Sequence, residues 1–117
     1  MNSIIAGLVS TVAGTGSTGS PSDGTATLAV MSSPAGCIYM AATNTIYVSD
    51  QGVSNRVRAI SLSSGIMSTF AGSTTGTADG TGTSALFSSP AFFASDSAYL
   101  YLTDNNNNLI RRISYPG

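Results

Sequence analysis

The chain alternates between short runs rich in β-branched and aromatic residues and short turns made mostly of Gly, Asn, Asp and Ser. Runs of this length that are bounded by turn residues are typical of β-strands. No window of eleven or more residues shows an apolar period of 3.6, so the pattern predicts no helix. The predicted strands cover residues 8–13, 35–40, 45–49, 56–61, 66–71, 91–94, 98–103 and 109–114.

The chain also contains an internal sequence repeat. Five blocks recur in the same order, so the chain holds two copies of one unit that differ by small deletions in loops. The matched blocks are STVAG at 10–14 and STFAG at 68–72 (offset 58), DGT at 23–25 and 79–81 and SSPA at 32–35 and 88–91 (both offset 56), YVSD at 47–50 and YLTD at 101–104 (offset 54), and NRVRAIS at 55–61 and NLIRRIS at 108–114 (offset 53).

The repeat length and the strand count together indicate an architecture. Four short antiparallel strands in each unit of about 40–50 residues are the sequence sign of a β-propeller blade. We therefore predict an all-β fold with two four-stranded antiparallel propeller-type blades. The predicted boundaries are a blade-completing strand at 1–13, a Gly/Thr/Ser-rich linker at 14–33, a first blade at 34–71, a second linker at 72–89 and an incomplete second blade at 90–117.

Each copy follows the same order of strand and turn residues. It begins at Pro34 with a short apolar strand, continues through an aromatic-rich strand ending at Asp50 and an Asn-x-x-Arg-x-Ile strand at 55–60, and ends in Ala-Gly at 71–72. This order resembles the NHL-repeat β-propellers over nearly the whole chain. The resemblance implies blades of four strands, in a family that includes protein-binding, RNA-binding, sensor and lyase modules. The matching positions of the second copy are Pro90, Tyr101, Asp104, Asn108, Arg111 and Ile113.

The predicted strands do not group into two complete four-stranded blades along the chain. The chain supplies one last-type strand, then a full set of four, then three, whereas closed propellers have about 4–8 complete blades. Two readings stay open. The N-terminal strand of one copy completes the second blade of the next, which joins subunits head-to-tail into a ring or filament; alternatively, the 117 residues are a fragment of a larger propeller that binds protein or glycan. The apolar positions of this assembly strand are Ile4, Ile5, Leu8, Val9 and Val12.

The composition disfavours the common kinds of catalytic, metal-binding and nucleic-acid-binding site. The chain has no His, Lys, Glu or Trp, and its formal net charge is −1. It lacks an imidazole base for a Ser or Cys nucleophile, four ligands for zinc, and the clustered basic residues that nucleic acids require. The missing His also places the lyase activity of propeller relatives out of reach. We therefore predict a non-enzymatic structural protein with no cofactor, no metal, no nucleic acid partner and no membrane span, whose first partner is another copy of itself.

Four charged residues occupy equivalent positions in the two copies. Asp50 corresponds to Asp104, and Arg58 corresponds to Arg111. A repeated Arg beside a repeated Asp predicts the same inter-strand ion pair in both copies, with a structural role. The single cysteine, Cys37, stands in an apolar run and is predicted to be a small buried side chain.

The two linkers are dense in hydroxyl groups, and the whole chain contains 20 Ser and 14 Thr. Scarce charge and abundant hydroxyls favour an extracellular or cell-surface location, where linker hydroxyls can accept O-linked sugars. The repeated Asp-Gly of each linker predicts a defined turn. The candidate O-glycan sites are Thr15, Ser17, Thr18, Thr74, Thr75, Thr77, Thr81 and Thr83.

Overall fold

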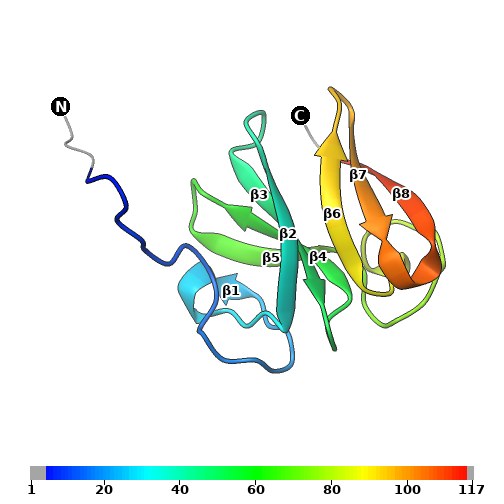
Figure 1. The fold of residues 1–117 in the computed structure, drawn as a ribbon, viewed down its shortest axis with the longest axis horizontal. Helices are drawn as coiled ribbons and strands as arrows, with labels where there is room; N and C mark the ends of the chain where they lie inside the picture. Colours follow the sequence, from blue (N-terminus) through cyan, green and yellow to red (C-terminus); the bar gives the residue numbers. More distant parts are fainter. Residues whose placement is uncertain (1–4, 116–117) are drawn as a thin grey trace.

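The protein is all-β and consists of two antiparallel sheets that lie side by side (Figure 1). This computed structural model describes residues 5–115. The first sheet has the order β1-β5-β4-β3-β2, and the second has the order β6-β7-β8. The elements are β1 (Gly24–Thr25), β2 (Ser33–Met40), β3 (Thr45–Gln51), β4 (Arg56–Ser61), β5 (Ile66–Ala71), β6 (Pro90–Ser95), β7 (Tyr99–Asp104) and β8 (Leu109–Ser114), with 3-10 turns η1 (Ala26–Leu28), η2 (Gly82–Ser84) and η3 (Asn105–Asn107).

Tight turns between consecutive strands set the hairpins of both sheets. Gly52 has a φ of 70° and Asn55 a φ of 46° in the turn between β3 and β4, and Asn108 has a φ of 55° in the matching turn before β8. Gly and Asn adopt this left-handed region more readily than other residues. The resulting registers are equivalent, since Val48 pairs with Arg58 in the first sheet and Leu102 with Arg111 in the second.

The main core lies between the two sheets. Tyr47 and Val57 of the first sheet are buried in one cluster with Leu100 and Leu102 of the second and with Phe87 of the linker between them. This arrangement buries a face of each sheet that water would otherwise contact.

The opposite face of the first sheet carries a second core, which the first linker covers. Val48, Ile60 and Met67 of the sheet pack there against Ala26 and Ala29 of the linker. Met67 is completely buried. The linker is therefore an ordered layer, and its two-residue strand β1 extends the sheet beyond β5.

Most of the strand predictions are confirmed. The strands β2 to β8 lie where the sequence pattern predicts them, with ends that differ by at most two residues. The very short β1 inside the first linker was not predicted, because two residues are too few to show a period.

Residues 8–13 pair with no strand of this single chain and are mostly exposed, so the predicted blade-completing strand stays a prediction. One prediction is wrong. Cys37 is exposed rather than buried, because β2 is the edge strand of its sheet. Ile4 of the predicted assembly strand lies outside the described residues.

Among the described residues, no helix has the length and apolar character needed to cross a membrane.

Candidate functional site

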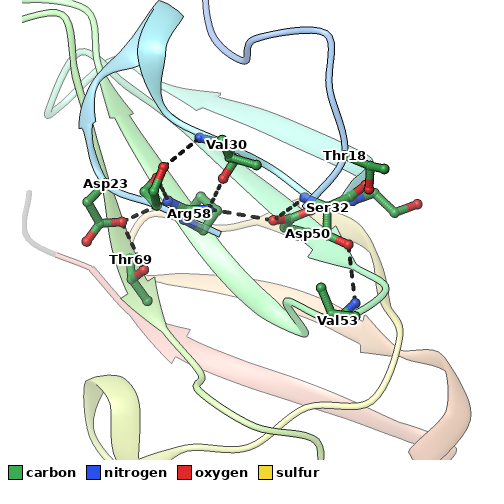
Figure 2. Close-up of polar contacts among 10 residues, drawn as sticks. Thr18, Asp23, Val30, Ser32, Asp50, Val53, Arg58 and Thr69 are labelled. Atoms are coloured by element: carbon green, nitrogen blue, oxygen red, sulfur yellow. Dashed lines mark hydrogen bonds and ion pairs between the residues drawn. The ribbon is translucent and has the colours of Figure 1, made fainter. Parts of the chain in front are cut away.

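A buried arginine ties the first linker to the first sheet (Figure 2). Arg58 of β4 has a side chain with 0% exposure. Its Nη2 donates to the Ser22 carbonyl at 2.6 Å and to Asp23 Oδ1 at 2.8 Å, and its Nη1 donates to the Val30 carbonyl at 3.1 Å. One guanidinium thus fixes three points of the linker, which the fork geometry of arginine allows.

Asp50 completes this site from the neighbouring strand β3. Its Oδ2 lies 3.6 Å from Arg58 Nη1, and both groups are fully buried. The backbone amides of Ser32 and Ser33 donate to Asp50 Oδ1 at 3.0 and 2.7 Å. These bonds compensate the carboxylate for the water it loses on burial, and they fix the end of the linker at the start of β2.

The second copy builds the same site around Arg111. Its Nη1 lies 2.9 Å from Asp104 Oδ2 and donates to the Leu86 carbonyl at 2.7 Å, while its Nη2 donates to the Ala78 carbonyl and to Asp79 Oδ1, each at 2.9 Å. The linker partners of Arg58 and Arg111 are related by the same sequence offset of 56.

The structure therefore brings together all four charged residues that the sequence singles out, as Asp50 with Arg58 and Asp104 with Arg111. Sequence reasoning missed the third member of each site, Asp23 or Asp79. The signal was present in the repeated Asp-Gly of the linkers, which indicates a turn but does not say what the carboxylate contacts. In each site one guanidinium pairs with two carboxylates and also donates to linker carbonyls, so the arrangement holds the linker on the sheet.

The two sites differ at their outer end. In the first copy, Thr69 of β5 donates from Oγ1 to Asp23 Oδ1 at 3.1 Å. The Asp23 side chain is 54% exposed, whereas that of Asp79 is 96% exposed. The difference arises because, within residues 5–115, the second sheet ends at β8 and has no strand in the place that β5 holds beside β4.

An open cleft of about 780 Å³ lies along β8 at that place. Its walls come from the end of β5, the second linker and the free edge of β8. The residues that line it include Ala71, Asp79, Gly80, Ala85, Arg111 and Ile113. This cleft combines a free strand edge with apolar side chains and a carboxylate.

The N-terminal segment is extensively exposed at its apolar positions. Val9 is 89% exposed and Leu8 is 71% exposed, and Ile5 and Val12 are also largely exposed. Figure 1 shows this segment leaving the molecule beyond β1, on the side of the first sheet that faces away from β8. An apolar segment of this kind contacts nothing that would bury it in the single chain.

All eight candidate O-glycan residues are exposed. Two of them also hold the linkers in place. Thr18 donates from Oγ1 to the Ser32 carbonyl at 3.1 Å, and Thr75 Oγ1 accepts from Asn55 Nδ2 at 2.8 Å. The other hydroxyls of this set include several that no side-chain hydrogen bond engages in the described part of the chain, such as those of Thr77 and Thr83.

The polar run at 104–108 forms a turn that belongs to the second Asp–Arg site. Asn107 Nδ2 donates to Asp104 Oδ2 and to the Gly76 carbonyl, each at 2.7 Å. Over residues 5–115, no group of three or more His, Cys, Asp or Glu side chains is arranged to hold a metal ion.

Comparison with known proteins supports the fold and leaves the family open. No family model matches the sequence, and no curated protein matches it significantly. A crystal structure of a structural genomics protein of unknown function from Bacteroides thetaiotaomicron VPI-5482 is similar, with a TM-score of 0.81 and 22% identity over 87% of this chain. The matched region spans 26% of that neighbour's length.

Proposed function

We propose that this chain is a non-enzymatic, self-assembling structural protein whose subunits join head-to-tail by strand donation. In each contact the segment at 8–13 of one copy adds as a strand to the free edge of β8 in another copy. The observation that carries the proposal is the cleft along β8, which lies where β5 lies in the first sheet. The segment at 10–14 repeats the sequence of the end of β5 almost residue for residue.

The contact is intermolecular because the segment leaves its own chain on the side of the first sheet that faces away from β8. Gly14 N donates to the Ala26 carbonyl at 2.9 Å, which ties the start of the first linker to the far face of the first sheet. The segment therefore extends away from β8, as Figure 1 shows. A segment that points outward at one end and a cleft at the other end form a heterologous pair, which closes into a ring or continues as a filament.

Apolar burial and backbone pairing both favour this contact. The strand edge of β8 leaves N–H and C=O groups that another strand can satisfy. Val9 and Val12 align with Met67 and Phe70 of β5, which pack in the two cores, so both lose exposure on docking. Burying one such side chain contributes roughly 1.5–3 kcal/mol. The low charge of the chain, 8% of its residues, keeps repulsion between neighbouring copies small.

The test is the oligomeric state of a variant that changes only the donated segment. Val9→Asp places a charge on a side chain that is 89% exposed in the single chain, so the subunit itself remains folded. We expect sedimentation and electron microscopy to show rings or fibres for the original chain and folded monomers for Val9→Asp. Leu28→Asp, at an exposed apolar position outside the segment, is the matched control and should still assemble. A folded, monomeric original chain at high concentration would contradict the proposal.

A second proposal is that the chain acts as part of a larger NHL-type propeller and binds a protein or glycan at its loop face. The observation that favours it is that the matched region spans 26% of the structural neighbour's length. In that case the strand in the cleft comes from a preceding or following repeat of a longer chain. Extending the reading frame past both ends would show further repeats, and the 117-residue chain would then fail to form rings or fibres.

A further inference from the structure

The outer end of the first Asp–Arg site depends on a hydroxyl that the second site lacks. Thr69 Oγ1 donates to Asp23 Oδ1 at 3.1 Å, and Arg58 Nη2 donates to the same oxygen at 2.8 Å. Asp79 receives the Arg111 bond at 2.9 Å, but it is 96% exposed. The second site thus has the same Arg and Asp residues as the first but lacks a hydroxyl in the position of Thr69.

The repeat identifies which residue belongs in that position. The offset of 58 that relates STVAG to STFAG places Thr11 on Thr69, and the offset of 53 places Arg111 on Arg58. In the first sheet Arg58 pairs with Thr69 across β4 and β5. The equivalent register sets Arg111 opposite Thr11 of the donated strand.

In the same register, an apolar side chain of the donated strand enters the apolar part of the cleft. Ile60 pairs with Met67, which is completely buried in the second core. The corresponding pair is Ile113 with Val9, and Ile113 lines the cleft together with Ala85. Val9 is apolar, as is the methionine at the equivalent position of β5, so it suits the apolar part of the cleft.

We propose that Thr11 of a second copy completes the Arg111–Asp79 site, with the donated strand in the register that β5 has on β4. This inference rests on the proposed strand donation, and it adds the residue that the partner contributes and the alignment of the two strands. The Thr11 hydroxyl donates to the Asp79 carboxylate, and Val9 packs on Ile113.

Disulfide trapping tests the register. In a Cys37→Ser background, the double variant S10C/R112C joins the positions that correspond to the Ala59–Ser68 pair of the first sheet. We expect mild oxidation to link S10C/R112C copies head-to-tail, and to link the shifted pairs L8C/R112C and V12C/R112C at least tenfold less. Preferential linking of either shifted pair, or association without any linking, would overturn the register and leave strand donation or self-association standing. Monomers in sedimentation, with no linking in any variant, would overturn the proposed function itself.

A second measurement tests the hydroxyl. Thr11 is exposed in the single chain, so Thr11→Val leaves the subunit folded. We expect Thr11→Val to weaken association about tenfold, through the loss of a hydrogen bond to a carboxylate, and Thr11→Ser to restore it. In an Asp79→Ala background, Thr11→Val should have no further effect. A full effect of Thr11→Val in that background would overturn the assignment of Asp79 as the partner of Thr11.

Discussion

Ser49 Oγ donates a hydrogen bond to the backbone carbonyl of Ala91 at 2.7 Å, and this bond joins the two sheets. The approach is close because Gly36 lies beside Ala91. A Cβ at Gly36 would overlap the Ala91 carbonyl oxygen, which belongs to backbone and cannot easily move aside. The glycine on β2 is therefore a condition for the packing of β6 against the first sheet.

We expect Gly36→Ala to lower the free energy of unfolding by about 1–3 kcal/mol, because the added methyl group forces the sheets apart. Urea unfolding of the folded subunit measures this loss. Gly19→Ala is the matched control, since the nearest atom to its added Cβ is a Val30 methyl group at 3.8 Å, which is an ordinary contact. Equal stability of Gly36→Ala and Gly19→Ala would show that the sheets do not depend on this close approach.

The two Asp–Arg sites should differ in their contribution to stability. Arg58→Met leaves the fully buried Asp50 without its partner, and breaking a buried pair in this way costs about 3–5 kcal/mol. Arg111→Met also leaves a fully buried carboxylate, that of Asp104, without its partner. We expect it to cost less than Arg58→Met in a single subunit, because Asp104 keeps the bond from Asn107 and the outer carboxylate Asp79 is 96% exposed and stays hydrated. Urea unfolding of the two variants in the Val9→Asp monomer compares them directly.

Arg112→Met provides the control for these two variants, because Arg112 is exposed and stacks over the Tyr99 ring at 4.5 Å. Its loss should stay near 1 kcal/mol or below. A larger loss for Arg111→Met than for Arg58→Met would contradict the ranking.

The strands of this protein were predictable because each carries its own local signal. Stretches such as β4 and β8 combine β-branched residues with flanking Gly or Asn, and both match the sequence pattern end to end. The same reasoning placed a strand at 8–13, where the composition is right but no partner strand is present. Sequence pattern reports the propensity of a segment, whereas the strand itself requires a neighbour.

The Asp–Arg sites were predictable in part. The repeat relates Arg58 to Arg111 and Asp50 to Asp104, and adjacent strands bring each pair together. The linker carboxylates Asp23 and Asp79 were not assigned to these sites, because the path of a linker of about twenty residues depends on tertiary contacts. Cys37 was misplaced for a related reason, since the pattern of β2 does not tell which strand forms the sheet edge.

A carboxylate–phenol pair on the second sheet gives the protein a local pH dependence. The hydroxyl of Tyr101 donates to Asp96 at 2.6 Å, and the amides of Ala98 and Tyr99 donate to the same side chain at 2.8 Å. The Tyr101 bond, followed by the two amide bonds, lowers the pKa of Asp96. The bond to Asp96 in turn raises the pKa of Tyr101.

The two shifts each add to stability, and their contributions are lost at opposite ends of the pH range. The Asp96 contribution is fully present above the usual carboxyl pKa of about 3.9 and is lost as the pH falls through the lower folded-state pKa. The Tyr101 contribution is present below the usual phenol pKa of about 10 and is lost as the pH rises through the raised value. We expect Tyr101→Phe to return the pKa of Asp96 toward its usual value in a carboxyl NMR titration. Tyr99→Phe should leave it lowered, because the Tyr99 contact comes from its backbone amide.

The exposure of all eight linker hydroxyls makes O-glycosylation a measurable expectation for the protein from its natural source. We expect an intact mass above the 11.8 kDa of the bare polypeptide, with the added mass in peptides that contain residues such as Thr77 or Thr83. Those two hydroxyls engage no side-chain partner within the described residues, so they are more available than that of Thr75. An intact mass equal to that of the bare polypeptide would dispose of this expectation and of the argument it lends to an extracellular location.

The cleft along β8 should accept the donated segment even when it comes as a separate peptide. Under the proposed strand donation, the Val9→Asp variant keeps its own β8 edge intact while its N-terminal segment no longer docks, so we expect it to be a monomer with an empty cleft. We expect a synthetic peptide of residues 4–14 to bind this variant and to slow amide hydrogen exchange along β8, since strand addition pairs the free backbone groups of that edge. The same peptide with Asp in place of valine at position 9 is the control and should not bind, because its carboxylate would enter the apolar part of the cleft beside Ile113. Protection of β1, β2 or β6 in place of β8 would place the contact on another sheet edge and contradict the assignment of the cleft.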